Sequence, residues 1–169
     1  PTLDPVSNIT INEDAPERTV SLGGISAGPS ESQPLAVTAS SSNTSLIDHP
    51  QVIYTSAQST GSLKFTPRLD AHGSSTISVT VTDGGLDGLL STPDDNLTHQ
   101  ETFTVTVNSV EDRPRAMDDS YDVDEGTTLV VSAAEGVLAN DQDPEGDPMQ
   151  AELVSSTSHG SLTFSSDGS

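Results

Sequence analysis

One segment decides the fold class: Ile77-Ser78-Val79-Thr80-Val81-Thr82, followed by Asp83-Gly84-Gly85. Its apolar side chains recur at every second position, as they do in a strand that has one face in a core and the other in solvent. Its β-branched residues favour extended backbone. The glycines after Asp83 supply a turn. The segment therefore predicts a half-buried β-strand that ends at a turn.

The same alternation recurs on both sides of this segment. Turn signals separate the runs, among them Gly23-Gly24, Gly28-Pro29 and Asp70 to Gly73. This spacing predicts about seven strands in an all-β Greek-key sandwich over residues 1–112. The other alternating positions are Ile9 and Ile11, Val20 and Leu22, Leu35 and Val37, Val52 and Tyr54, Leu63 and Phe65, and Phe103, Val105 and Val107.

The chain then repeats itself. Ile9-Thr10-Ile11-Asn12-Glu13 is echoed by Tyr121-Asp122-Val123-Asp124-Glu125, and Gly61-Ser62-Leu63-Lys64-Phe65 by Gly160-Ser161-Leu162-Thr163-Phe164. Far fewer residues follow Phe164 than follow Phe65. The sequence therefore predicts a second copy of the domain that lacks its last strands.

We accordingly expect a complete sandwich at 1–112, a linker at 113–117 and the N-terminal half of a second sandwich at 118–169. Half a sandwich would expose an apolar face and unpaired backbone edges. We therefore expect residues 115–169 to be disordered or to pair with a second chain. Because the first residues lack the pattern of a signal peptide, we also expect the segment to come from inside a longer chain.

Charge restricts the partners. Acidic residues outnumber basic ones 26 to 5, and the net charge of −21 would repel phosphate backbones and anionic membrane surfaces. We therefore expect no nucleic-acid partner, and no direct membrane insertion because no apolar run approaches the roughly 20 residues that span a bilayer. So many carboxylates are either solvated or gathered around hard cations such as calcium. The chain has no cysteine, so disulfides cannot brace its fold. Bound calcium is another way to brace a fold.

Catalytic patterns are missing. The sequence contains no G-x-S-x-G elbow, phosphate-binding loop or G-x-G-x-x-G turn, and its four histidines are scattered without a partner histidine at metal-ligand spacing. These observations predict a protein that is not an enzyme, with histidines on surface loops.

Four motifs carry a resemblance to a family. Leu69-Asp70-Ala71-His72, Val79 to Gly85, Thr104 to Pro114 and Asn140 to Asp143 resemble the LDRE, VxAxDGG, DxNDNxP and DxD motifs of the cadherin repeat. Residues 118–147 look still more like the tandem cadherin-like and Ig-like repeats of large bacterial surface proteins. The resemblance implies an extracellular or cell-surface location, a structural or adhesive role, and neighbouring repeats of the same chain as partners.

The resemblance also implies calcium as the bound ion, held at the junction between consecutive domains. The residues that match the family's ligands are Glu13, Asp70, Glu111, Asp112, Asp141, Asp143 and Asp147. The sequence departs from the family at His72, Asn108 and Asp112, so it predicts fewer ions than usual. The spacing Asp141-x-Asp143-x-x-x-Asp147, on a loop bent by Pro and Gly, independently suits calcium. We interpret Asp83 as a turn residue.

Two functions from different classes follow. The first is a calcium-stiffened spacer or adhesive repeat. The second is a carbohydrate-binding accessory module of a secreted polysaccharide-acting protein, which would need exposed aromatic rings, whereas Tyr54, Tyr121 and the phenylalanines fall in strand-like positions. Homophilic and glycan contacts are both left open as partners, and self-association between identical repeats is compatible with the first function.

Overall fold

The structure is a computed structural model that describes all residues from Pro1 to Ser169. It divides into two compact units, Pro1–Val110 (unit 1) and Glu111–Ser169 (unit 2), which we describe separately. No helix in either unit has the length and apolar character that a membrane crossing requires.

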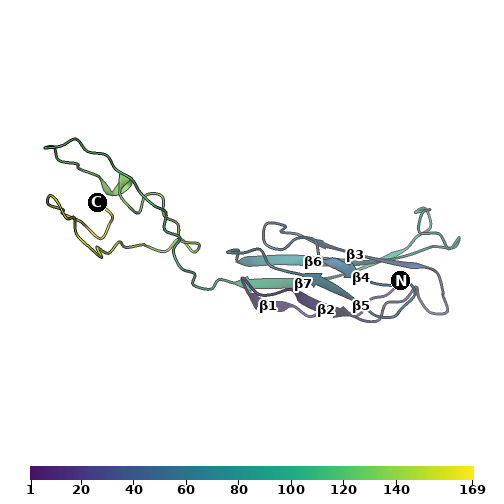
Figure 1. The fold of residues 1–169 in the computed structure, drawn as a ribbon. Helices are drawn as coiled ribbons and strands as arrows, with labels where there is room; N and C mark the ends of the chain where they lie inside the picture. The colour runs from purple at the N-terminus through teal and green to yellow at the C-terminus, as the bar shows by residue number, and fades with distance from the viewer. The chain divides into compact units, whose positions relative to one another are not determined.

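Unit 1 holds all seven strands of the chain (Figure 1). Each predicted run of alternating residues coincides with one of them, and only Tyr54 falls one residue beyond its strand. The strands are β1 (Ile9–Asn12), β2 (Arg18–Leu22), β3 (Leu35–Ser41), β4 (Gln51–Ile53), β5 (Gly61–Phe65), β6 (Gly73–Asp83) and β7 (Thr98–Asn108).

The strands form two sheets, with the orders β1-β7-β6-β3 and β2-β5-β4. The chain changes sheet between β1 and β2, β2 and β3, β3 and β4, and β5 and β6, which gives a sandwich with crossed connections. All pairs are antiparallel except β1 and β7, which run parallel with Ile9 opposite Val105 and Ile11 opposite Val107. The predicted all-β sandwich is confirmed.

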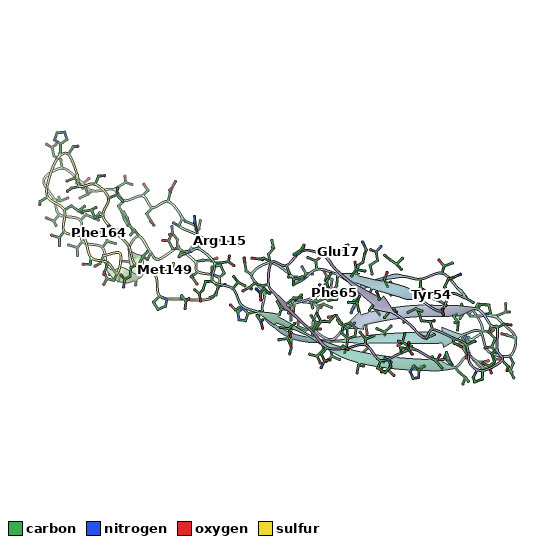
Figure 2. The ribbon with its side chains drawn as sticks, turned by 90° about the horizontal axis from the view of Figure 1, so that it is seen from below. Glu17, Tyr54, Phe65, Arg115, Met149 and Phe164 are labelled. Atoms are coloured by element: carbon green, nitrogen blue, oxygen red, sulfur yellow. The ribbon has the colours of Figure 1, made fainter.

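The core lies between the two sheets. Ile77, Val79 and Val81 of β6 are fully buried, whereas the serines and threonines between them face outward. From the other sheet, Leu63 is fully buried and Phe65 is 5% exposed; Figure 2 marks Phe65 within unit 1 and its counterpart Phe164 within unit 2. The period-two pattern therefore assigned the buried faces correctly.

Unit 2 is built differently. It contains no strand, one short 3-10 turn at Ala133–Glu135 and one isolated β-bridge between Arg115 and Gln142. The strand expected at Leu162 and Phe164 is therefore wrong. Leu63 lies under a second sheet, whereas the equivalent Leu162 is 45% exposed. Without an opposing sheet, the extended segment gains too little apolar burial to offset the entropy lost on ordering a ladder.

Candidate metal centre

The first residues of unit 2 are hydrogen-bonded to its acidic loop, residues 141–147. The backbones of Arg115 and Gln142 exchange two hydrogen bonds, with N···O distances of 2.7 and 3.2 Å. Two residues further on, the N–H of Met117 donates to Oδ1 of Asp141 at 2.8 Å. These bonds fix the segment after unit 1 alongside the loop, so carboxylates from both stretches gather in one place.

The loop is shaped by Asp143. Its Oδ1 accepts hydrogen bonds from the backbone N–H groups of Glu145, at 3.1 Å, and Asp147, at 3.0 Å. Gly146 closes the turn with φ +77°, which a residue without Cβ adopts readily. One oxygen of Asp143 therefore builds the turn and leaves the second oxygen for other partners.

Glu111 faces the loop. The pKa of the Glu111 carboxyl is raised above its ordinary value, first by the negative charge of Asp147 and a hydrogen bond shared with it, then by desolvation, and then by the charges of Glu145 and Asp143. Glu111 therefore lies within hydrogen-bond reach of Asp147 and feels the negative charges of Glu145 and Asp143. Unit 2 thus concentrates negative charge at this loop.

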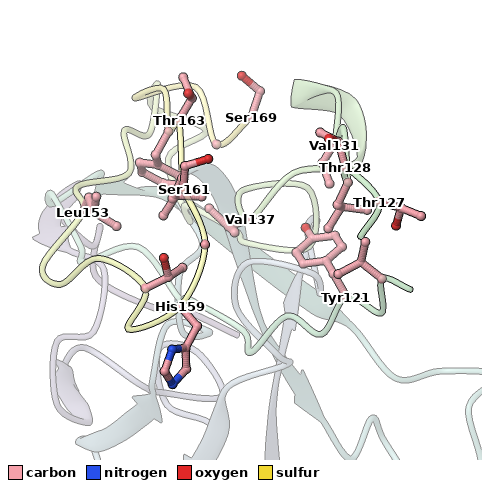
Figure 3. Close-up of a pocket in the computed structure, with 17 residues that line it drawn as sticks. Tyr121, Thr127, Thr128, Val131, Val137, Leu153, His159, Ser161, Thr163 and Ser169 are labelled. Carbon is pink, nitrogen blue, oxygen red and sulfur yellow. The ribbon is translucent and has the colours of Figure 1, made fainter. Parts of the chain in front are cut away.

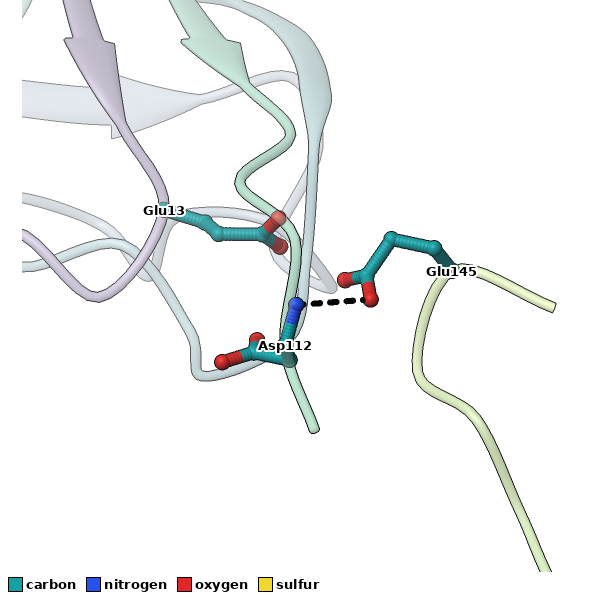
Figure 4. Close-up of side chains that lie close together, drawn as sticks. All are labelled: Glu13, Asp112 and Glu145. Carbon is teal, nitrogen blue, oxygen red and sulfur yellow. Dashed lines mark hydrogen bonds between the residues drawn. The ribbon is translucent and has the colours of Figure 1, made fainter. Parts of the chain in front are cut away.

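Asp112 and Glu145 lie at the same place. The backbone N–H of Asp112 donates to Oε2 of Glu145 at 3.0 Å (Figure 4). A carboxylate oxygen of each residue lies within 4.8 Å of one on the other. The second oxygen of Glu145, Oε1, is buried and accepts no hydrogen bond. A buried carboxylate oxygen without a donor is costly, and a cation would satisfy it.

The acidic site comprises Glu111, Asp112, Asp143, Glu145 and Asp147. Its donors are all carboxylate oxygens, without sulfur or imidazole, and such a set suits a hard cation that takes six to eight oxygens. A divalent cation would offset the charge repulsion at Glu111. It would also satisfy the buried oxygen of Glu145 that has no hydrogen-bond donor. The donor types of the acidic site therefore suit calcium.

A second acidic group lies in unit 1, where β7 ends. Glu13 follows β1, and its side chain is fully buried. Its Oε1 accepts a hydrogen bond of 2.7 Å from the N–H of Val110, whereas its Oε2 is buried, accepts none, and lies 3.8 Å from Nδ1 of His72. Asp14 and Asp70 bring carboxylate oxygens within 4.8 Å of each other, each on backbone of positive φ.

Sequence reasoning named most of these residues. It grouped Glu111 and Asp112 with Glu13 and Asp70, and separately grouped Asp143 and Asp147 with Asp141 in the loop. In unit 2, Glu111 instead lies beside Asp147 and near Asp143. Asp141 was also named, and its Oδ1 accepts a hydrogen bond from the backbone N–H of Met117. Glu13 and Asp70 lie in unit 1, near one end of the sheet β1-β7-β6-β3. The backbone N–H of Glu13 donates a hydrogen bond to the carbonyl of Asn108, and Gly73, three residues after Asp70, pairs with Val107.

Two acids were missed. Glu145 stands between Asp143 and Asp147 in the same loop, and Asp14 directly follows Glu13. Motif matching passes over both because they are not motif positions. Counting every carboxylate on the predicted loops would have included them.

Asp83 behaves as the turn residue that the sequence predicts. Only 2% of it is exposed, and its Oδ1 accepts from the N–H of Gly85 at 3.1 Å and of Leu97 at 2.8 Å. Burial alone would raise the pKa of Asp83, but these N–H groups and the α-amino group of Pro1 outweigh burial and lower it. Its carboxylate ties together the two ends of the loop between β6 and β7.

Comparison with known proteins gives one match. The family model described as "Bacterial Ig domain" matches residues 111–169. No curated protein and no solved structure matches the chain significantly. Ig-like domains of this kind are typically non-enzymatic, which agrees with the absence of catalytic motifs. Residues 111–169, about a third of the chain, are therefore similar to a bacterial Ig-like repeat.

Proposed function

We propose that the chain is a calcium-binding structural module of an extracellular bacterial protein, in which the ion stiffens the connection after β7. The observation that carries the proposal is the acidic site of unit 2, where Glu111 is repelled by Asp147, Glu145 and Asp143. Repulsion of this kind opposes folding until a cation neutralises it. Bound calcium would neutralise this repulsion, so that the site stabilises the fold and no longer destabilises it.

The brace follows from where the ligands lie along the chain. Glu111 and Asp112 come three and four residues after β7 ends at Asn108, and Asp143, Glu145 and Asp147 belong to a loop some 30 residues later. One ion that bound both stretches would cross-link them and limit the conformations of the segment that links successive repeats. A string of such modules would be a stiff stalk.

Unit 1 offers a second set of ligands. Glu13 is a fully buried carboxylate with an oxygen that accepts no hydrogen bond, and an oxygen in that state is more stable beside a cation than alone. The sequence-based hypothesis assigns Glu13 and Asp70 to the same ion group as Glu111 and Asp112. We retain it as part of the proposal, with single variants as its test.

The extracellular location and the adhesive role belong to the proposal. They are supported by the bacterial Ig-like match, and the net charge of −21 is compatible with calcium-rich surroundings. The partners we propose are the neighbouring repeats of the same chain.

Calcium titration of residues 1–169 by calorimetry tests the proposal, with magnesium as the comparison ion. We expect saturable calcium binding, weaker magnesium binding because magnesium demands a smaller octahedral site, and stabilisation of about 2.7 kcal/mol per site at 100 times the dissociation constant. Chelator should increase the flexibility seen by small-angle scattering. A titration without heat, together with melting that ignores chelator, would refute calcium binding.

A further inference from the structure

Unit 2 contains an apolar groove of about 680 Å³. Figure 3 shows Tyr121 and Val131 on one side of it and Leu153 and Ser161 on the other. Several of its apolar side chains are wide open to solvent: Val123 is 56% exposed, Leu162 45% and Tyr121 41%. The apolar residues that matter here are Tyr121, Val123, Leu129, Val131, Leu162 and Phe164.

The internal repeat identifies what covers the equivalent residues in unit 1. Tyr121 and Val123 occupy the repeat positions of Ile9 and Ile11, and Leu162 and Phe164 those of Leu63 and Phe65. In unit 1, Leu63 is fully buried and Phe65 is 5% exposed. Leu162 is thus exposed where its counterpart Leu63 is buried, and Tyr121 and Val123 are exposed where Ile9 and Ile11 are partly buried against the core.

One strand of unit 1 pairs with the first set of positions and shares a core with the second. β7 pairs in parallel with β1, placing Val105 opposite Ile9 and Val107 opposite Ile11. Its Phe103, Val105 and Val107, each at most 2% exposed, belong to the same core cluster as Leu63 and Phe65. Residues 111–169 contain no strand in that place.

We propose that the groove of unit 2 is a strand-acceptor site, which binds an extended polypeptide segment of the β7 type. The segment would pair in parallel along Tyr121–Asp124, as β7 pairs along β1, and would insert its alternate apolar side chains between Tyr121 and Phe164. Added strands gain affinity from backbone hydrogen bonds and specificity from pockets for alternate side chains.

Charge specifies the partner further. Asp122 and Asp124 alternate with the apolar residues of the accepting edge, so acidic groups opposite them would be repelled. β7 carries Thr102, Thr104 and Thr106 between its apolar residues. The partner is therefore a polypeptide strand with apolar residues at alternate positions and uncharged or basic residues between them.

The probe is a fluorescent peptide with the sequence of Thr98–Asn108, added to the chain of residues 1–169. We expect saturable binding by anisotropy and at least about tenfold slower hydrogen exchange at residues 121–124. The matched control peptide carries F103S, V105S and V107S. Because each buried apolar side chain contributes roughly 1.5–3 kcal/mol and 1.4 kcal/mol is a factor of ten, it should bind at least about tenfold more weakly.

A variant in the protein locates the site. Phe164→Ser should weaken binding at least about tenfold, whereas Leu86→Ser, on the exposed loop of unit 1, should leave it unchanged. A peptide that is N-methylated at alternate residues removes backbone donors while the protein stays intact, so its loss of binding supports strand pairing even where Phe164→Ser perturbs the fold of unit 2.

Three outcomes would overturn the proposal: no binding at millimolar peptide, equal binding of the serine control, or binding without protection of residues 121–124. If the chain instead self-associates through these residues and excludes the peptide, a second copy is the occupant and the assignment to a β7-type strand is wrong. Measurement with calcium and with chelator separates this result from the calcium proposal, on which it does not depend.

Discussion

The backbone N–H of Val110 donates a hydrogen bond of 2.7 Å to Oε1 of Glu13, a residue 97 positions earlier in the chain. The bond fastens the end of β7 to the end of β1, beside the parallel pair that these strands form. It also holds one oxygen of a fully buried carboxylate and leaves the other, Oε2, without a hydrogen bond. A single side chain thus joins the ends of β1 and β7 and keeps one buried carboxylate oxygen without a hydrogen-bond donor.

Glu13→Gln separates these two roles. The amide keeps an oxygen for the N–H of Val110 but loses the charge, so we expect stability in chelator to be unchanged or higher, because an uncompensated buried charge is removed. In calcium, the gain in melting temperature should shrink. Glu13→Ala, which leaves the N–H of Val110 unpaired, should cost about 1–3 kcal/mol even in chelator.

Thermal melting with and without calcium checks both variants. The matched control is Glu17→Gln, because Glu17 is half-exposed and pairs only with Lys64 on the surface. If Glu13→Gln retains the full calcium-induced shift, Glu13 is not a ligand.

Glu111 should titrate abnormally. Its pKa is raised above the ordinary value, chiefly by Asp147, so in chelator the fold around the acidic site should be most stable below the ordinary glutamate pKa. It should lose stability as pH rises through the raised pKa, because the site then carries the repelling charge. NMR titration of the Glu111 side chain measures this. Calcium should lower the apparent pKa, and so should Asp147→Asn; an ordinary pKa in chelator would contradict the clustering.

Asp141→Asn with Asp143→Asn should weaken calcium binding and leave unit 1 folded, because its core strands lie outside the loop. Asparagine keeps the Oδ1 acceptors that serve Met117, Glu145 and Asp147, so the loop should hold its turn. Calorimetry and circular dichroism measure the two effects. The control is Asp122→Asn with Asp124→Asn, which removes the same charge from unit 2 outside the acidic site; equal affinity in the two double variants would mean that only net charge matters.

Glu145→Gln extends this comparison to the acid that motif matching missed. Because Oε1 of Glu145 is buried without a donor and Asp141 is tied to Met117, we expect Glu145→Gln to reduce calcium affinity more than Asp141→Asn alone. Each single variant removes one negative charge, so a difference in affinity reports the position of the acid. If Asp141→Asn reduces affinity more than Glu145→Gln, then Asp141 is the ligand and Glu145 is not.

Asp83→Ala should destabilise unit 1 without affecting calcium binding. The change leaves the N–H groups of Gly85 and Leu97 without their acceptor, at a position where Asp83 is only 2% exposed. Each unpaired group costs roughly 1–3 kcal/mol. Asp48→Ala, at an exposed pair with Arg68, should cost less than about 1 kcal/mol. Urea unfolding distinguishes them, and equal midpoints would show that the loop does not depend on Asp83.

Much of the acidic site could be predicted because calcium ligands recur at fixed spacings on loops. The spacing identified Asp143 and Asp147, but it could not show that Asp143 spends Oδ1 on the turn or that Glu145 enters the site. The first is a local turn within residues 143–147, whereas the second needs the loop to lie beside Asp112, where the backbone bonds between Arg115 and Gln142 join stretches distant in sequence.

The sequence by itself determined the strands of unit 1 and their buried faces. Alternation at Ile77, Val79 and Val81 is a local property, and the pleat of a strand converts it directly into an inward and an outward face. The repeat of Gly61–Phe65 at Gly160–Phe164 was equally local. Only the tertiary structure decided which of these segments became strands, because Leu63 is buried in the core between two sheets, whereas Leu162 lies in a unit without sheets and stays 45% exposed. Apolar alternation indicates which side chains of a segment can be buried. The sheet that buries them has to be supplied by residues far away in the chain.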